Sequence, residues 1–146
     1  MPTLIDKNLM RQIIMDHYNN PLYKSKPKKN GYKSIHVKSI NCIDDIYVYL
    51  NLKNNKIVDC LWNGVACAIT SASTDIMCGL VINKSIEEVL NIISEYLKMI
   101  YEKKFNEKIL KEALAFMNVS KQAARIKCAI IGCNAIKSIL LRNKNE

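Results

Sequence analysis

The stretch that decides the fold is residues 62–73, WNGVACAITSAS. A strand-like run ends at Trp62, a glycine turn follows, and the small residues after Cys67 begin a helical pattern. Cys67 is therefore expected where a strand gives way to the N-terminus of a helix. Unpaired backbone N–H groups and the helix dipole favour an anion there, so we expect this thiol to ionise more easily than usual. The alternative is that Cys67 is only a small buried residue at a tight turn.

Three short strands are predicted in the chain that leads to this stretch. Residues 32–41 alternate weakly, whereas residues 46–53 alternate strictly between apolar side chains and polar or aromatic ones. A turn at residues 54–56 then leads into the third strand, residues 57–62. Because these turns are short, the strands should pair as an antiparallel sheet.

Helices are predicted before and after the strands in the sequence, because apolar residues recur there at helical spacing. Their ranges are residues 4–18, 70–82, 85–100, about 107–117, and 120 or 121 to about 142. Strands followed by helices indicate an α+β fold. We predict a three-stranded antiparallel sheet with helices packed on one face, an N-terminal helix and long C-terminal helices. Residues 1–146 are expected to form a single domain.

The composition is that of a globular protein, with 49% hydrophobic and 24% charged residues among 146. No apolar run approaches the roughly 20 residues that span a bilayer. Residues 1–7 lack the apolar core of a secretion signal. We therefore expect a cytoplasmic protein without a membrane partner.

The net charge of +9 raises the alternative of a basic nucleic-acid-binding module with a structural zinc. The 22 basic residues include only three arginines, and the lysines are scattered along the chain. Phosphate-binding surfaces usually use arginine and cluster their charge on one face. We therefore expect no nucleic acid as a partner, although the positive surface could steer an acidic protein.

The six cysteines indicate metal or thiol chemistry, because the cytosol keeps thiols reduced. Cys42 and Asp44 lie in the turn between the first two predicted strands, and an antiparallel meander returns the strand exit at Cys67 to that turn. Cys128 lies early in the last helix, where it can approach the sheet edge. We predict that these four residues form one site, with Asp45 as the rival of Asp44. Three thiolates and a carboxylate would satisfy tetrahedral zinc, and thiolates also suit an iron–sulfur cluster.

The other candidate residues have supporting or structural roles. Arg125 and Lys127 are expected to lower the thiol pKa at the site and to offset the negative charge of its ligands. His17 is expected to cap or pack, and His36 to lie on the surface. The remaining cysteines match no motif and are predicted to be core residues: Cys60, Cys78 and Cys133.

Four motifs cover nearly the whole chain in order. They are MRQIIMDHYNNP at residues 10–21, NCID at residues 41–44, GVACAI at residues 64–69 and RIKCA at residues 125–129. They resemble, in the same order, the ILDHYxNP opening and the C-G-D, G-x-G-C-x-[IS] and R-[IV]-K-C-[AT] motifs of the iron–sulfur scaffold family that includes NifU, IscU and SufU.

Two features resemble the SufU-like branch of that family. Lys127 stands where IscU-type members carry histidine, and residues 106–118 form a segment that those members lack. The resemblance implies a sulfurtransferase-like accessory protein that accepts persulfide sulfur from a SufS-like cysteine desulfurase and serves downstream iron–sulfur proteins. It also implies a zinc ion held by Cys42, Asp44, Cys67 and Cys128. The alternative is a scaffold that builds a transient iron–sulfur cluster on the same ligands.

Cys42 is the expected sulfur acceptor. A metal-bound thiolate is a damped nucleophile, so one ligand must leave the metal before it attacks a persulfide. Cys42 lies on a turn and is predicted to cost least to release, whereas Cys67 is held between a strand and a helix and Cys128 lies on a helix. The resemblance to the SufU-like branch points the same way, and Arg125 and Lys127 would stabilise the exposed thiolate.

The chain departs from the family motifs at three positions, and none of them is a predicted ligand. Ile43 and Ala66 replace motif glycines, and Ala123 stands where proline is common. Because Ile43 removes the freedom of glycine to adopt positive φ, we expect the geometry of this loop to differ from that of the family.

Overall fold

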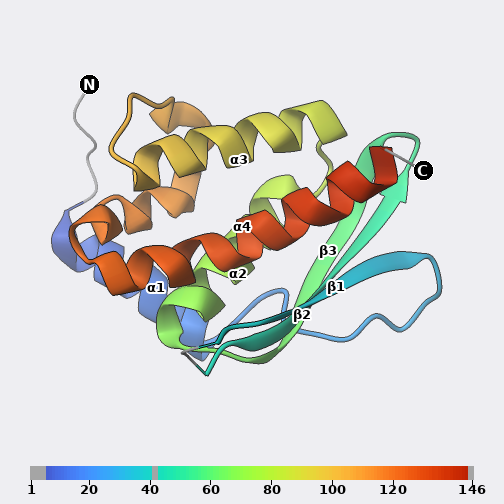
Figure 1. The fold of residues 1–146 in the computed structure, drawn as a ribbon, viewed down its shortest axis with the longest axis horizontal. Coiled ribbons are helices and arrows are strands. Elements are labelled where there is room, and N and C mark those ends of the chain that lie inside the picture. Colours follow the sequence, from blue (N-terminus) through green and yellow to red (C-terminus); the bar gives the residue numbers. More distant parts are fainter. Residues whose placement is uncertain (1–5, 41–42, 145–146) are drawn as a thin grey trace.

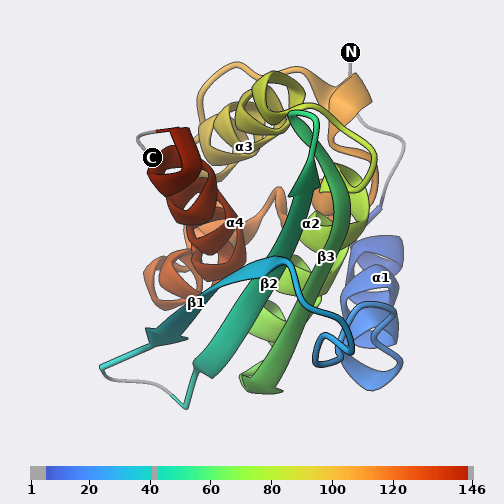
Figure 2. The ribbon, with the colours of Figure 1, turned by 90° about the vertical axis from the view of Figure 1, so that its right-hand side faces the viewer.

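The computed structural model describes residues 6–40 and 43–144. The predicted α+β fold is confirmed: an antiparallel sheet in the order β1-β2-β3 carries helices on one face (Figures 1 and 2). In chain order the elements are α1 (Lys7–Asn19), β1 (Tyr32–Lys38), β2 (Asp45–Lys53), β3 (Lys56–Val65), α2 (Ala68–Val81), α3 (Ile86–Ile100), the 3-10 helices η1 (Glu107–Ile109), η2 (Lys111–Phe116) and η3 (Val119–Lys121), and α4 (Ala123–Lys144). No helix within the described ranges is long and apolar enough to cross a membrane.

The strand β2 sits at the centre of the sheet. Its inward side chains Ile46, Val48 and Leu50 are completely buried, as the strict alternation of this segment predicts. The turn from β2 to β3 is made by Asn54 and Asn55, both with positive φ. Asparagine tolerates this conformation, which fits the twist of a two-residue hairpin. The register of the meander is therefore set by the pattern of β2 together with this turn.

The helix α2 is the centre of the core. It contacts β3 on one side and lies between α1 and α4 on the others (Figure 1). Most of its side chains are buried, and all but Asp75 are small or apolar. The next helix, α3, begins at the predicted capping box, in which the Glu88 N–H donates to Ser85 Oγ and the Ser85 N–H donates to the Glu88 carboxylate.

The prediction of one helix over about 107–117 is wrong. The structure has three short 3-10 helices between residues 107 and 121 instead. Lys111 has a φ of +47°, which no continuous right-handed helix can contain. The segment still buries Leu110 and Phe116 completely. Its apolar residues thus serve the core, but their spacing does not specify an α-helix.

The chain between α1 and β1 follows the edge of the sheet. The Trp62 N–H donates to the Tyr23 carbonyl at 3.1 Å, and the Ser25 N–H donates to the Trp62 carbonyl at 2.8 Å. The Lys24 ammonium lies 5.1 Å from the centre of the Trp62 ring. These contacts tie the start of the lysine-rich loop to β3 near the strand-to-helix junction.

Candidate metal centre

Asp44 is a buried carboxylate directly before β2, with 1% of its surface exposed. Its Oδ1 accepts the backbone N–H of Cys67 at 2.8 Å, and its Oδ2 accepts the Thr70 hydroxyl at 2.6 Å. The Asp44 carbonyl accepts the Ser39 N–H at 2.8 Å. The turn before β2 is thereby fixed to the N-terminus of α2, where the helix dipole favours a negative charge.

Cys67 lies at the predicted junction of strand and helix. It is the N-cap of α2, and its Sγ accepts the Thr70 N–H at 3.4 Å. Gly64, three positions earlier, has a φ of +130°, and a Cβ at this position would lie 2.2 Å from the Asp45 carbonyl oxygen. Only glycine allows the two strands to approach so closely. The glycine of the central motif thus brings the ends of β2 and β3 together.

Cys128 of α4 completes a group of three potential ligands. One ligand atom each from Asp44, Cys67 and Cys128 lies within 4.8 Å of the other two. Donor atoms bound to one tetrahedral zinc at about 2.0–2.3 Å are about 3.3–3.8 Å apart. Two thiols and a carboxylate within 4.8 Å of one another can bind one zinc ion after small shifts of their side chains. Cys42, the fourth predicted ligand, lies outside the described residues.

Burial raises the pKa of the Cys128 thiol to about 12; a hydrogen bond to Thr70 opposes this effect, and a hydrogen bond to Cys67 adds to it. The lowering of the thiol pKa expected from Arg125 and Lys127 does not outweigh burial at Cys128. Both basic residues are exposed, so water screens their charge. Without a metal this thiol is protonated at neutral pH, and a metal that binds it must displace the proton.

A cleft of about 650 Å³ opens at these ligands. Cys67 and Cys128 line it, together with Arg125, Lys127 and an apolar wall formed by Ala68, Ile69, Ala123, Ala124 and Ile131. Both predicted supporting cations thus line the cleft beside the site.

Asp45, the rival of Asp44, is not a member of the ligand group. Its Oδ1 lies 2.5 Å from His36 Nε2 instead.

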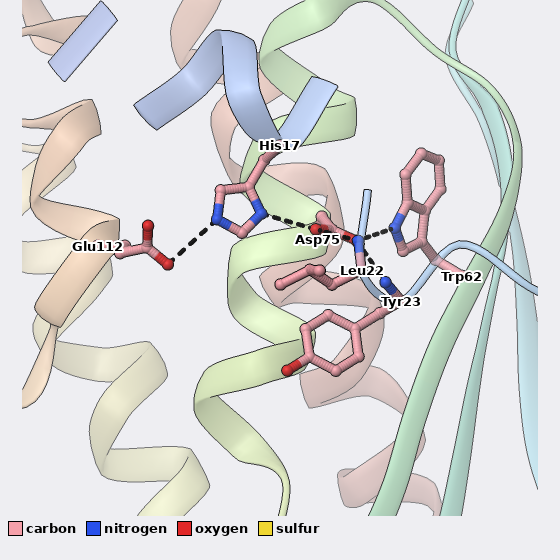
Figure 3. A network of polar contacts seen from close by, with 6 residues as sticks. All are labelled: His17, Leu22, Tyr23, Trp62, Asp75 and Glu112. Carbon is pink, nitrogen blue, oxygen red and sulfur yellow. Dashed lines mark hydrogen bonds and ion pairs between the residues drawn. The ribbon is translucent and has the colours of Figure 1, made fainter. Parts of the chain in front are cut away.

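A second buried carboxylate, Asp75, lies further along α2 and was not predicted from the sequence (Figure 3). Its two oxygens accept hydrogen bonds at 2.7–3.0 Å from His17 Nδ1, the Leu22 and Tyr23 amides and Trp62 Nε1. It therefore joins α1, the following loop and β3. Asp75 is the only charged residue of α2, and a lone acid in an apolar helix is the signal that identifies it.

His17 packs inside the protein, as predicted. Its Nδ1 faces Asp75, and its Nε2 lies 3.1 Å from Glu112 Oε1. Burial lowers the pKa of this imidazole, but the hydrogen bonds to Asp75 and Glu112 outweigh burial and leave the pKa raised. The motif around residues 10–21 therefore holds the N-terminal helix in place and supplies no ligand to the group around Asp44.

The three cysteines without a motif are core residues, as predicted. Cys60 and Cys78 are completely buried, and Cys133 is 1% exposed. The Sγ atoms of Cys60 and Cys78 lie 3.3 Å apart, and burial, followed by the hydrogen bond to Cys60, raises the pKa of Cys78 well above its usual value. Protonated thiols of this kind act as small apolar residues.

Comparisons with known proteins agree with this arrangement. Residues 9–137 match the family described as NifU-like N terminal domain. The iron-sulfur cluster assembly scaffold protein IscU of Thermotoga maritima is 27% identical over 137 residues, which cover 94% of this chain and 96% of that protein. The zinc-dependent sulfurtransferase SufU of Bacillus subtilis is 32% identical over 130 residues, which cover 88% and 87%. A crystal structure of a Fervidobacterium islandicum protein, proposed as an iron–sulfur cluster assembly scaffold of the SUF system, superposes with a TM-score of 0.81 at 27% identity, over 88% of this chain and 94% of the other.

Proposed function

The chain belongs to the family of NifU-like N-terminal domains, and from this premise we propose that it is a zinc-dependent acceptor of persulfide sulfur in iron–sulfur cluster assembly. The observation that carries the proposal is the convergence of a buried carboxylate and two thiols, Asp44, Cys67 and Cys128. The similarity to the protein named as a zinc-dependent sulfurtransferase supports the same choice.

Asp44, Cys67, Cys128 and Cys42 are the proposed zinc ligands. A bound zinc would stabilise the thiolate forms near neutral pH and would join the turn, the strand end and α4. Thr70 orients Asp44 through a hydrogen bond of 2.6 Å, as partners of ligating carboxylates commonly do. Thr70 thereby holds the Asp44 carboxylate beside the Cys67 thiol at the N-terminus of α2.

We propose Cys42 as the sulfur acceptor and a SufS-like cysteine desulfurase as the donor. The Cys42 thiolate attacks the terminal sulfur of the donor persulfide, a new S–S bond forms on Cys42, and the S–S bond of the donor breaks. The donor cysteine leaves as a thiolate, so no external oxidant is needed. Arg125 and Lys127, exposed at the cleft, stabilise the anions that take part in this exchange.

Metal analysis of the protein purified without added iron, together with its absorption spectrum, tests the proposed cofactor. We expect colourless protein with one zinc per chain. A brown protein that contains iron and sulfide would instead support a cluster scaffold, the role named for the IscU relative.

The acceptor is tested by reaction with the desulfurase and cysteine, followed by mass spectrometry of the persulfide. We expect the label on Cys42 and its loss in Cys42→Ala, with the fold largely retained. A label mainly on Cys128 would refute the assignment of Cys42.

A further inference from the structure

The helices α2 and α4, which carry Cys67 and Cys128, meet through a glycine. A Cβ placed on Gly132 of α4 would lie 2.4 Å from Thr74 Oγ1 and 2.8 Å from Thr74 Cα on α2. Both distances are far below the roughly 3.5–4.0 Å of normal carbon contacts. The Cα belongs to the backbone and cannot rotate away, so any side chain at position 132 must move one helix away from the other.

The ligands lie one helical turn from this contact. Cys128 precedes Gly132 by four residues, and Thr70 precedes Thr74 by four, so each pair shares one face of its helix. Thr70 donates to Asp44, lies 3.4 Å from Cys67 Sγ and is a hydrogen-bond partner of Cys128. The Thr74–Gly132 contact thus lies one helical turn from the ligand group, between the same two helices.

We propose that Gly132 is a positioning residue of the metal centre: its missing side chain lets α4 lie close enough to α2 for Cys128 to share an ion with Asp44 and Cys67. This inference rests on the proposed metal site. Ligand distances in metal sites tolerate deviations of only about 0.2 Å. A separation of the helices would therefore move the Cys128 thiol away from the other two ligands.

The contact acts through shape. The Thr74 hydroxyl is buried, and it has no hydrogen-bond partner among the residues that the structure describes. Thr74→Val keeps the branched shape and removes only the hydroxyl. We expect this variant to bind metal as the wild type does, because replacing an unpaired buried polar group by an apolar one of equal shape is nearly neutral or stabilising.

The decisive variant is Gly132→Ala, with Gly79→Ala of α2 as the matched control. Both replace a helical glycine, so both gain the same intrinsic helix propensity. At position 79 the three atoms nearest to the new Cβ all belong to the half-buried Tyr23 side chain, at 3.0–3.3 Å, and none of them is a backbone atom. Zinc affinity is measured by competition with a chromophoric chelator, and thiolate ligation by the charge-transfer absorption of the cobalt-substituted protein.

We expect Gly132→Ala to bind zinc at least about tenfold more weakly, as displaced supporting residues of metal sites do. Its cobalt form should lose part of the thiolate charge-transfer absorption, whereas Gly79→Ala should match the wild type in both measurements. A purely structural role would lower the melting temperature of the metal-free and metal-bound forms equally and leave the cobalt spectrum unchanged. That pattern, or equal zinc affinity in folded Gly132→Ala, would overturn the inference.

If Gly132→Ala does not fold, the inference is tested by comparing the zinc affinity of Thr74→Gly with that of the double variant Gly132→Ala/Thr74→Gly. The double variant removes the contacts with the Thr74 side chain but keeps the 2.8 Å approach to its Cα. Lower zinc affinity in the double variant than in Thr74→Gly would support the inference, and equal affinity would overturn it. A wild-type protein that binds neither zinc nor cobalt would overturn the proposed metal site as well.

Discussion

Asp44 and Asp75 are both buried carboxylates, with 1% and 0% of their surface exposed, and both are bound to α2 or belong to it. Asp75 is surrounded by N–H donors from the imidazole of His17, two amides and an indole. Asp44 has an amide and a hydroxyl as donors, and two thiols lie within 4.8 Å of its ligand oxygen. The two acids are thus similar in burial and different in the atoms around them.

This difference separates a structural carboxylate from a ligand. Four N–H donors satisfy Asp75 and connect three segments of the chain. The two amides and the indole are donors only, and the imidazole of His17 has its two nitrogens beside Asp75 and Glu112. The thiols beside Asp44 become metal ligands once they lose their protons. Burial alone does not distinguish the two roles, whereas the chemistry of the neighbouring atoms does.

The largest effect is expected from Asp75→Ala in the metal-free protein. The variant leaves buried N–H donors and an imidazole without their acceptor, which costs about 3–5 kcal/mol of unfolding free energy. Urea denaturation measures this loss. The control is Asp16→Ala, an exposed acid of α1, which should change stability by less than about 0.5 kcal/mol. A comparable small change for Asp75→Ala would show that its donors find other partners.

Removal of zinc is expected to act on the other carboxylate site. Chelation should lower the unfolding free energy by about 3–4 kcal/mol if the free zinc exceeds Kd by a hundred- to a thousandfold. Thermal melting with and without chelator measures the effect, and Cys67→Ser should melt early and respond little to the chelator. The same melting curve for metal-free and metal-bound wild type would contradict a site that contributes to folding.

A smaller effect separates Asp44 from its neighbour in sequence. Asp44→Ala leaves the part-buried Cys67 N–H and the buried Thr70 hydroxyl without their acceptor, at a cost of about 1–3 kcal/mol. It also opens a ligand position, so that bound zinc exchanges faster. Asp45→Ala removes a half-exposed contact with His36 and should cost less than about 1 kcal/mol. Stopped-flow transfer of zinc to a chelator compares the exchange rates. Faster exchange in Asp45→Ala alone would move the ligand assignment by one residue.

The smallest effect is the pH dependence that His17 gives to the Asp75 network. Its pKa is raised in the folded state, so its contribution to stability is complete below the unfolded value of 6.5 and is lost as pH rises through the folded pKa. The stability difference between wild type and His17→Gln should thus be larger at pH 6 than at pH 9. Asp75, Glu112, Tyr23 and Lys111 are the titratable groups that face or adjoin the imidazole.

Glu112→Gln provides the test of that mechanism. Glu112 is half-exposed, and its removal should reduce the pH dependence without abolishing it, because the Asp75 contact remains. Denaturation at several pH values measures both variants. A stability difference that grows toward alkaline pH would contradict the assigned sign.

The sequence determined the order of the elements and the chemical character of the site. Alternation in residues 46–53 and the capping box at Ser85 each depend on neighbours along the chain, and the structure confirms both. The small residues around Cys67 likewise place the thiol at the junction of strand and helix. The four motifs identified the family because each of them is a short segment that can be recognised from neighbouring residues alone.

Only the tertiary structure decided which residues surround these segments. The helix predicted over about 107–117 is replaced by short 3-10 helices, in which Lys111 has a positive φ while Leu110 and Phe116 are completely buried. The partial burial of Cys128 raises its pKa although Lys127 is adjacent and Arg125 is three positions away in sequence, and this burial depends on the packing of α4 against α2. The order of charged residues along the chain does not show how deeply a thiol is buried, and burial shifts its pKa.

The roles of Asp75, Thr70 and Gly132 also depend on residues that are distant in sequence. Asp75 meets His17 across 58 positions, and Thr70 meets Asp44 across 26. Gly132 approaches Thr74 only because two helices separated by α3 and the 3-10 segment pack together. Local sequence sets backbone preference and side-chain chemistry, whereas the partners of a buried group are fixed when the whole core closes around it.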